Sequence, residues 1–369
     1  MKKIAIIGAS YLQLPLVQKC KEMGIETHCF AWEEGAVCKE ISDYFYPVSI
    51  IDKEQILKIC KEIGIDGITS IASDVAVPTV CYVSEKMDLI GNTFQSSVLC
   101  TNKYLMRTCF LDNNIASPRF IVANDLNSIG HLKFPLIVKP TDRSGSRGVQ
   151  RIDIDNELKH AIDRAKVESF SKEVIIEEFI SGQEISVESI SWKGKHYIIT
   201  ITDKVTSGEP YFVELEHHQP SLLSKDIIDN VKDQTIKALN ALGVNYGASH
   251  TEFKISNEGK LFIIEIGARM GGDFIGSDLV FLSTGYDYLK STINIALGQF
   301  EMPQMLDEKY SGVYFLSKET ERLLQIIQNT GNYNEILVSE ITDTELHYVK
   351  CSADRSGYFI YQSGKKFKI

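Results

Sequence analysis

The chain has 369 residues, of which 44% are hydrophobic and 24% charged, an ordinary globular composition that leaves no room for a large disordered or fibrous region. Single hydrophobic cores stop growing near ~250 to 300 residues, so the length predicts two or three domains. The net charge of -10 repels a phosphate backbone and argues against non-specific nucleic-acid binding. Anionic ligands must therefore be met by local clusters of Lys and Arg.

Cysteine usage and hydropathy predict a cytoplasmic protein. The eight cysteines are scattered and form no CxxC pair, which argues against a zinc knuckle or a disulfide framework and favours a reducing compartment. The apolar run 4–7 stops at Gly8 and polar residues follow it, so we interpret it as a buried strand rather than a signal peptide. Because no stretch approaches the ~18 apolar residues of a membrane helix, we expect no membrane partner.

The first ninety residues alternate short apolar runs with helical patterns. The pattern covers residues 4–8, 14–23, 27–30, 53–63 and 67–71. Such alternation is typical of a parallel sheet with crossover helices. The turn Gly8-Ala9-Ser10 lacks the full GxGxxG pattern and does not predict a dinucleotide site. It either presents helix amides to an anion or is a plain glycine turn.

A change of pattern near residues 91–100 marks a domain boundary, because polar residues cluster there before a new helix begins around Thr101. From residue 120 to 267 strands are frequent and often in hairpin order, with helices at 156–167 and 225–242, which predicts an α+β domain. The segment from about residue 301 combines a strand at 312–316 with a short helix near 321–328.

The first chemically informative stretch is a buried strand that ends at Lys139. The loop 141–149 follows with two glycines, two serines and two arginines. Amides of such a loop can enclose phosphate oxygens while the lysine supplies a point charge. A mobile surface loop after an exposed lysine explains the same residues, so this stretch alone does not decide.

The second stretch is an apolar strand that becomes acidic at Glu177-Glu178 and resumes after Glu184. One carboxylate there can accept a hydrogen bond from an adenine amino group and another can accept from ribose hydroxyls. Two ordinary strands joined by a polar turn remain the alternative.

The third stretch reads as an antiparallel hairpin around the turn Ser256-Asn257-Glu258-Gly259. With a centred register Glu252 faces Ile263 and lies diagonal to Glu265, whereas a two-residue shift places the two carboxylates directly opposite. Period-two alternation divides the hairpin into two faces. The polar face carries Glu252, Glu265, Gly267 and Arg269, and the apolar face carries Phe253, Ile255, Phe262, Ile264 and Ile266.

The paired carboxylates predict a cation site. Two carboxylates ~5 Å apart repel by roughly 3 kcal/mol at an effective dielectric of ~20, so a shared proton or a cation must lie between them. Oxygen ligands beside a phosphate-binding loop favour magnesium. A solvated hairpin face with Arg269 as counter-ion is the alternative.

The order and spacing of these three stretches resemble the ATP-grasp superfamily over nearly the whole chain, especially its L-amino-acid (dipeptide) ligase, carbamoyl-phosphate synthase-like and purine-pathway branches. The resemblance implies an α/β and α+β multidomain fold, with a Rossmann-like domain at 1–98 followed by an ATP-grasp domain at 99–300. It implies a lid subdomain at about 115–185 and a C-terminal α+β segment at 301–369 packed on the ATP-grasp core.

The resemblance also assigns roles to individual residues. The residues expected to contact ATP phosphates are Lys103, Lys139, Ser144, Gly145, Ser146 and Gly148. Glu177, with the backbone of Phe179 and Ile180, is expected to hold adenine, and Glu184 ribose. Glu252 and Glu265 are expected to ligate Mg²⁺ or Mn²⁺. Arg269, together with Lys139, is expected to be catalytic. Many members of the superfamily carry asparagine where this chain has Gly267, so the second magnesium lacks that ligand here and water replaces it.

The substrate must be read by residues near Arg269 and by the segment 202–220. We expect His217 or His218, with Asp273 and the glycines Gly271 and Gly272, to read a substrate amine or carboxylate, although a solvated polar loop explains either histidine equally well. No Ser-His-Asp or Cys-His arrangement requires a covalent enzyme intermediate.

The implied function is an ATP-dependent ligase that joins a small-molecule carboxylate to an amine through an acyl-phosphate. A carboxylase-like or carbamoyl-phosphate synthase-like enzyme that activates bicarbonate is an alternative. A non-catalytic ATP-binding module is another, although the complete set of Glu252, Glu265 and Arg269 speaks against it. The habit of the family suggests a homodimer.

Overall fold

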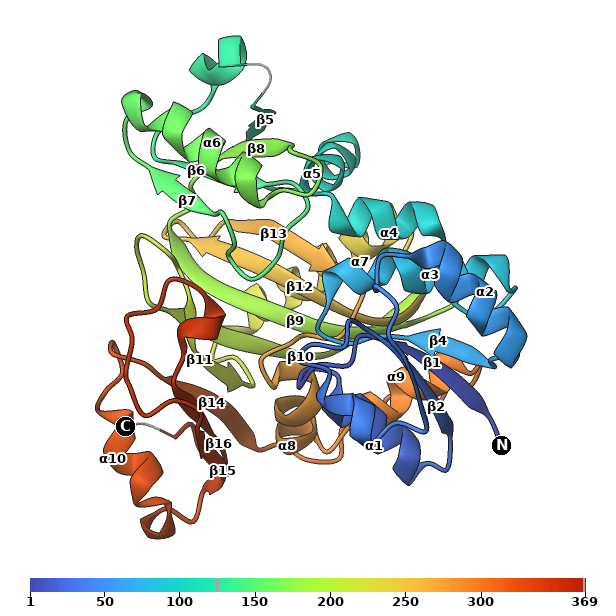
Figure 1. The fold of residues 1–369 in the computed structure, drawn as a ribbon. Coiled ribbons are helices and arrows are strands. Elements are labelled where there is room, and N and C mark those ends of the chain that lie inside the picture. Colours follow the sequence, from blue (N-terminus) through green and yellow to red (C-terminus); the bar gives the residue numbers. More distant parts are fainter. Residues whose placement is uncertain (124–125, 368) are drawn as a thin grey trace.

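Three sheets organise the chain in the computed structural model, which describes residues 1–123, 126–367 and 369 (Figure 1). The predicted α/β and α+β fold class is confirmed. A four-stranded sheet forms the N-terminal domain, a second four-stranded sheet forms a lid, and an eight-stranded sheet extends from beneath the lid to the C-terminal strands that complete it. Within these described residues, no helix is long and apolar enough to cross a membrane.

The N-terminal domain is a parallel sheet in the order β3-β2-β1-β4. Its strands are β1 (Lys3–Ile7), β2 (Glu26–Phe30), β3 (Tyr44–Tyr46) and β4 (Gly67–Thr69). Its helices are α1 (Leu14–Glu22), α2 (Lys53–Ile63) and α3 (Val77–Lys86), with the short turns η1 (Val37–Glu40) and η2 (Asp74–Ala76). The apolar runs of the sequence form these strands because both faces of a parallel sheet are covered.

The lid is an antiparallel sheet in the order β5-β8-β6-β7 with its own small core. Its elements are β5 (Phe120–Val122), η3 (Leu126–His131), β6 (Leu136–Pro140), β7 (Gln150–Ile152), η4 (Asp155–Glu157), α6 (Leu158–Glu168) and β8 (Val174–Glu178). The helices α4 (Phe94–Thr101) and α5 (Lys103–Asp112) connect it to the N-terminal domain.

The large sheet has the order β13-β12-β9-β10-β11-β14-β16-β15. Its first strands are β9 (Gly182–Trp192), β10 (Lys195–Thr206), β11 (Glu214–Gln219), β12 (Tyr246–Ser256) and β13 (Leu261–Gly267). The C-terminal strands are β14 (Tyr310–Leu316), β15 (Ile336–Ile341) and β16 (Gly357–Ser363). Because β14 pairs with β11, the C-terminal segment extends this sheet rather than forming a separate layer against it.

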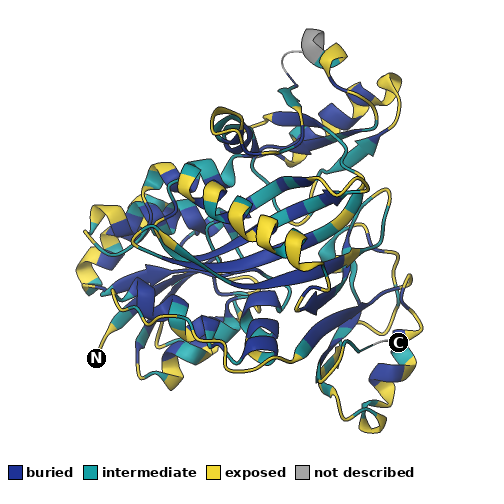
Figure 2. Ribbon diagram, turned by 180° about the vertical axis from the view of Figure 1, so that it is seen from behind, coloured by how far each residue is buried: buried dark blue, intermediate teal, exposed yellow. Residues whose placement is uncertain are grey.

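Helices and short turns complete the covering of the large sheet. They are α7 (Lys225–Ala241), η5 (Ile275–Leu279), α8 (Val280–Thr284), α9 (Tyr288–Ala296), α10 (Leu323–Gln328), η6 (Thr330–Asn332) and η7 (Ser352–Asp354). The middle of β9 is buried continuously from Ile185 to Ser191, and Figure 2 shows the central strands buried beneath helices whose outer faces are exposed.

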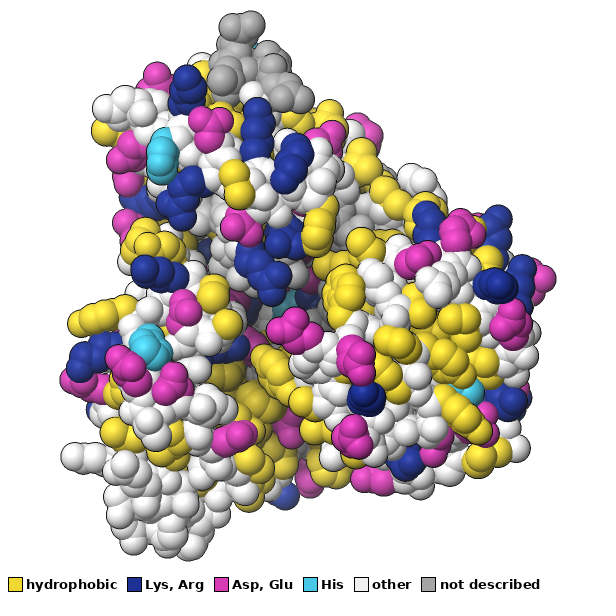
Figure 3. Space-filling view, in the orientation of Figure 1, with side chains coloured by type: hydrophobic (Ala, Val, Ile, Leu, Met, Phe, Trp, Pro, Cys, Tyr) yellow, Lys and Arg dark blue, Asp and Glu magenta, His cyan; other side chains and the backbone are white. Residues whose placement is uncertain are grey.

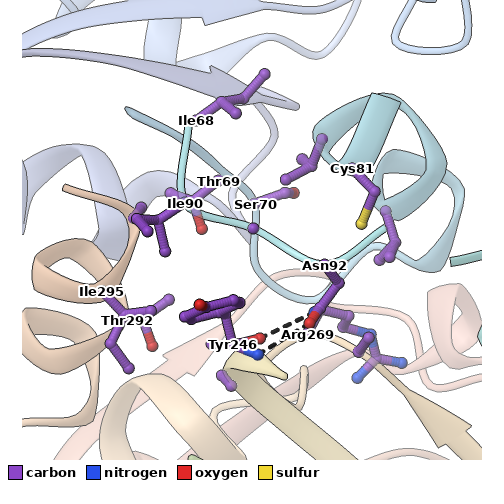
Figure 4. A pocket seen from close by; sticks show the side chains of 17 residues that line it. Ile68, Thr69, Ser70, Cys81, Ile90, Asn92, Tyr246, Arg269, Thr292 and Ile295 are labelled. Carbon is purple, nitrogen blue, oxygen red and sulfur yellow. Dashed lines mark hydrogen bonds between the residues drawn. The ribbon is translucent and has the colours of Figure 1, made fainter. Parts of the chain in front are cut away.

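The N-terminal domain packs directly on the large sheet. One core cluster contains Ile68 of β4 together with Ile293 of α9 and Met270. At the same seam the side-chain oxygen of Asn92 accepts hydrogen bonds from the backbone N–H groups of Asn245 (2.7 Å) and Tyr246 (2.9 Å), and its amide donates to the Tyr246 carbonyl (2.9 Å) (Figure 4). The start of β12 is therefore held by the N-terminal domain.

Gly182→Ala is expected to destabilise the protein, because a Cβ at this position would lie 1.9 Å from the carbonyl oxygen of Ile255 and φ is +146°. In the variant this clash would push β9 away from β12. We therefore expect the free energy of unfolding to fall by more than about 2 kcal/mol. Gly331→Ala is the matched control, since its Cβ meets nothing within 4 Å. Equal melting temperatures for the two variants in thermal unfolding would contradict this account.

Candidate active site

A cavity between the lid and the large sheet brings together most of the residues singled out in the sequence. The predicted residues that line it are Lys103, Lys139, Ser144, Gly145, Ser146, Glu177, Phe179, Ile180, Glu184, Glu252, Glu265, Gly267 and Arg269. They come from the start of α5, from β6 and the loop after it, from the segment 177–184 that joins β8 to β9, and from the β12–β13 hairpin with Arg269 just beyond it. Lys and Arg side chains gather around the hollow between the lid and the N-terminal domain (Figure 3).

Lys139 stands at the end of β6, where it is buried against Glu177 of the neighbouring strand. Its Nζ lies 2.7 Å from Glu177 Oε2, and the other carboxylate oxygen lies 2.9 Å from Nε of the fully buried Arg107. Burial opposes ionisation of Glu177, but Arg107 and Lys139 outweigh it and lower the pKa of the carboxyl group. Glu177, the carboxylate predicted to contact adenine, is therefore already paired with two cations at the cavity wall.

The loop after Lys139 turns sharply where the sequence places Gly145 and Ser146, because both residues have positive φ (66° and 57°). Such a turn directs successive amides toward one side, as anion-binding loops do. Gly148 also has a positive φ of 71°, and a Cβ there would lie 3.0 Å from Pro140. Gly148 is not among the residues that line the cavity; it shapes the loop from behind.

The two carboxylates of the hairpin lie directly opposite each other. Glu252 pairs with Glu265 and Phe253 pairs with Ile263, with a register shift between these two pairs. Of the two registers considered, the one with opposed carboxylates is correct. The bulge that produces it breaks the strict alternation expected along β13.

The predicted apolar face of the hairpin is wrong for Phe262 and Ile264. The buried hydrophobic side chains of β13 are Leu261, Ile263 and Ile266, whereas Ile264 lines the cavity. The physical reason is the extra residue on β13 at the bulge, which reverses the facing of the segment before it. The polar face still presents Glu252, Glu265, Gly267 and Arg269 to the cavity.

Each of the two hairpin carboxylates holds a lysine from another element. Lys103 Nζ lies 2.7 Å from Glu265 and donates a second hydrogen bond to the carbonyl of Arg143 in the lid loop (2.7 Å). Lys204 Nζ lies 2.7 Å from Glu252. The residues predicted to ligate magnesium are therefore charge-compensated by lysines, and Lys103 joins the hairpin to the loop.

Lys204 is the centre of a three-carboxylate cluster. Its Nζ also lies 3.2 Å from Glu184 and 3.2 Å from Glu214, and oxygens of Glu184, Glu214 and Glu252 all lie within 4.8 Å of one another. Burial disfavours the ammonium ion, but these three carboxylates outweigh it and raise the pKa of Lys204 well above its ordinary value. This all-oxygen set has the donor chemistry of a hard divalent cation site.

Arg269 is held by a carboxylate from the N-terminal domain. Its Nε and one terminal nitrogen donate to the two oxygens of Asp74, both at 2.8 Å. Burial opposes protonation of Arg269, but Asp74 outweighs it and raises the pKa of the guanidinium further. A two-pronged arginine–carboxylate pair fixes orientation as well as charge.

A second cavity extends from Arg269 toward the N-terminal domain. It is lined by the turn Gly8–Gln13, Trp32, Glu34, His217, Gly272 and Asp273, among other residues. The two cavities share the residues Asp74, Arg143, Ser144, Gly145, Glu214, His250, Glu252 and Arg269. They therefore adjoin at Glu252 and Arg269.

Only one of the two neighbouring histidines faces this second cavity. His217 is 1% exposed and lies 3.9 Å from Asp273, and neither ring nitrogen has a hydrogen-bond partner in the part of the chain that the structure describes. Burial lowers the pKa of His217. His218 points to the other face of β11, where its ring bonds to Glu216 (2.8 Å) and Tyr361 (3.0 Å). The suggestion that His218 reads substrate is therefore wrong, because successive residues of a strand face opposite sides.

Asp273 lines the second cavity, but both of its oxygens accept hydrogen bonds from Arg355 at 2.8 Å. Gly272 also lines this cavity. Gly271 instead donates its N–H to Glu188 (3.0 Å), and a Cβ there would lie 2.7 Å from that carboxylate. Gly271 thus contacts Glu188 rather than the cavity. Arg355, from the C-terminal segment, pairs with Asp273, and the sequence analysis did not predict this contact.

Comparison with known proteins gives the same reading as the geometry. Residues 132–278 match the model of the ATP-grasp domain. The chain is 28% identical over 245 residues to alanine–anticapsin ligase of Bacillus subtilis (strain 168), covering 59% of this chain and 51% of that protein. The chain therefore contains an ATP-grasp domain.

Solved structures share this ATP-grasp fold over almost the whole chain. The L-amino acid ligase of Bacillus licheniformis superposes with a TM-score of 0.81 at 21% identity, covering 99% of this chain and 94% of the other. The N5-carboxyaminoimidazole synthetase of Staphylococcus aureus complexed with ADP gives 0.80 at 16% identity, covering 99% and 94%. The chain spans about half the length of the curated relatives it matches.

Several residues of the ATP-grasp site were not identified from the sequence as site residues. They are Asp74, Arg107, Glu188, Lys204, Glu214, His250 and Arg355. His250 was identifiable, because it lies two residues before Glu252 on the same face. It bonds to Glu188 through Nδ1 and lies 3.3 Å from Glu252 through Nε2. Burial opposes protonation, but Glu188 outweighs it and raises the pKa of His250 to about 9.

Lys204→Met is expected to destabilise the site in the absence of metal, because Glu184, Glu214 and Glu252 then lose the lysine that they share. Breaking a buried ion pair costs about 3 to 5 kcal/mol. Mn²⁺ should restore part of the loss by occupying the carboxylates. The measurement is the melting temperature with and without Mn²⁺. Lys260→Met is the control, since Lys260 pairs with Glu258 on the exposed surface, and an equal Mn²⁺ shift in both variants would contradict the expectation.

Proposed function

We propose that the chain is an ATP-dependent ligase that joins a carboxylate to an amine through an acyl-phosphate and releases ADP and phosphate. The observation that supports this proposal is that two cavities adjoin at Glu252 and Arg269, which line both of them. One cavity has the features of a nucleotide site and the other opens toward the N-terminal domain. A phosphoryl group at their junction would have access to a second molecule.

The nucleotide would occupy the cavity under the lid. Adenine would lie at the hinge near Glu177, Phe179 and Ile180, and ribose near Glu184. The phosphates would face Lys103, Lys139 and the loop residues Ser144, Gly145 and Ser146, with Gly148 shaping the turn. Glu252 and Glu265 would hold Mg²⁺ or Mn²⁺, which would screen phosphate charge. Since Gly267 provides no side-chain ligand, water would complete the coordination of a second ion.

The chemistry follows from the leaving group. A carboxylate resists attack because its leaving group would be oxide. Transfer of the γ-phosphoryl group from ATP to a carboxylate oxygen breaks the bond to ADP and forms an acyl-phosphate. The amine nitrogen then attacks the acyl carbon, phosphate departs and the amine loses a proton. Positioning and charge stabilisation account for most of the catalysis in such a reaction, and Arg269 is placed to stabilise the developing negative charge.

The second cavity is lined by polar groups suited to amino-acid-like substrates. His217 lines the second cavity, and its two buried ring nitrogens have no hydrogen-bond partner among the described residues, which makes it the candidate reader of a substrate amine or carboxylate. Asp273, neutralised by Arg355, and Gly272 would shape the far end of the same space. The name of the relative alanine–anticapsin ligase supports amino acids as the first substrates to test.

Phosphate release is expected only when ATP, Mg²⁺ and a matching carboxylate and amine are all present. Paired amino acids are tested first, each alone and together, with bicarbonate as a separate arm. Release that depends on bicarbonate would instead support a carboxylase-like reaction. Absence of turnover in every arm, together with tight MgATP binding, would support a non-catalytic ATP-binding module and contradict the ligase proposal.

Arg269→Met is expected to lower kcat by about a hundredfold or more while MgADP affinity changes little, because the guanidinium acts on charge that develops during reaction. Initial rates and a nucleotide titration measure the two effects. Arg164→Met is the control, since this arginine lies on the exposed face of α6. Retention of full kcat in Arg269→Met would remove Arg269 from the proposed chemistry.

His217→Gln is expected to raise KM for one substrate of the pair by about tenfold or more, because a ligand contact of the buried imidazole is lost. His218→Gln is a control of the same chemistry on the opposite face of β11, and KM should remain unchanged in it. Steady-state kinetics with the pair found by phosphate release measure both. Equal KM values for the wild type and His217→Gln would remove His217 from substrate recognition.

A further inference from the structure

Gly267 is glycine because of space and not because of backbone conformation. Its φ lies outside the left-handed region, yet a Cβ on it would lie 2.6 Å from Asp74 Oδ1 and 3.2 Å from Nε and Cζ of Arg269. Any side chain at this position would have to displace one partner of the Asp74–Arg269 pair. This chain has glycine where many members of the superfamily carry asparagine. The space that a side chain at position 267 would need is occupied by the carboxylate of Asp74, which belongs to the N-terminal domain.

Asp74 reaches this position because two loops pack tightly together. It follows β4 in the N-terminal domain, and the N–H of Ala72 donates to the carbonyl of Met270, directly after Arg269 (3.1 Å). The Cβ of Ala72 lies 3.3 Å from the place that a Cβ on Gly272 would take. The contact is therefore built into the seam between the domains, not made by a mobile surface side chain.

Packing alone does not hold Arg269. A small, mostly apolar cavity lies along the domain seam, and Arg269 is one of the residues that line it (Figure 4). Apart from Asp74, the guanidinium donates only to the carbonyl of Met270 (3.2 Å) within the described residues. A long side chain beside an unfilled space has alternative rotamers, so a two-pronged acceptor is what selects one.

We propose that Asp74 is a positioning residue that fixes the guanidinium of Arg269 at the junction of the two cavities, and that residue 267 is glycine because Asp74 occupies the space of its side chain. The N-terminal domain then completes the catalytic centre. The proposal rests on the proposed function for the role of Arg269 in turnover. Its structural part, the competition for space between Asp74 and a side chain at position 267, does not depend on which reaction the protein catalyses.

A thermodynamic cycle tests the structural part without turnover. The proteins are the wild type, Asp74→Ala, Gly267→Ala and the double variant, compared by melting temperature. Gly267→Ala alone is expected to lose several degrees, whereas in the Asp74→Ala background the same change should cost little, because the colliding carboxylate is gone. Gly331→Ala is the control for a harmless added methyl group. Additive effects in the cycle would overturn the claim about space.

A spectroscopic measurement tests the orientation of Arg269. In ¹⁵N-labelled protein the Nε–H resonance of Arg269, assigned by its loss in Arg269→Met, should be protected from exchange in the wild type. It should shift and lose protection in Asp74→Asn, which keeps the shape but removes the charge. An unchanged resonance in that variant would overturn the positioning role.

Nucleotide and metal binding separate positioning from direct ligation. The affinity of Asp74→Asn for Mn²⁺ with ADP, followed by titration, should stay within about threefold of the wild type. A tenfold or greater loss would mean that Asp74 is itself a metal ligand and would overturn the proposal. With a substrate pair in hand, kcat should fall at least tenfold in Asp74→Asn while KM for ATP is unchanged; unaltered kcat would overturn the catalytic consequence. If no pair is found, the proposed function fails while the first three measurements still decide the role of Asp74.

Discussion

The organising constraint of this structure is that buried charges at the cleft must be paired. Glu252 and Glu265 are opposed across a hairpin, and each would repel the other at a separation typical of cross-strand partners. Lys204 and Lys103 remove that conflict, each at 2.7 Å. The two lysines come from β10 and the start of α5, so the hairpin cannot be neutralised unless these elements are folded around it.

The same constraint links the domains to one another. Lys103 contacts both the hairpin and the lid loop, so it joins the large sheet to the lid. Arg269 contacts Asp74 of the N-terminal domain, and Arg355 of the C-terminal segment contacts Asp273 beside the second cavity. Each interface that borders the cleft thus carries a charge pair in which removal of one partner would leave the other buried and uncompensated.

Local patterns predicted the parts of the site that lie along single elements. Alternation in β12 and β13 placed Glu252, Glu265 and Arg269 on one face, and the strand before the glycine loop placed Lys139 at its end. The bulge next to Glu252 was not predictable, since the extra residue on β13 has no mark in the local alternation. It is also the reason that Ile264 faces the cavity. Asp74 escaped notice because its partner is far away in sequence: Asp74 and Arg269 are 195 residues apart. Lys204 lay in the segment expected to read the substrate, but its place among three carboxylates depends on the pairing of β10 with β9 and β11.

The pairing of charges also explains how such a cleft can accept a nucleotide at little electrostatic cost. Under the proposed function, phosphate oxygens would take Lys103 as a partner while a divalent cation would take Glu252 and Glu265. Lys204 would keep Glu184 and Glu214 as partners, so each charge that loses one partner would still have another. A site with unpaired carboxylates would bind the cation more strongly but would be less stable when empty. A site without the carboxylates would have only lysines to offer, and the cation would be lost.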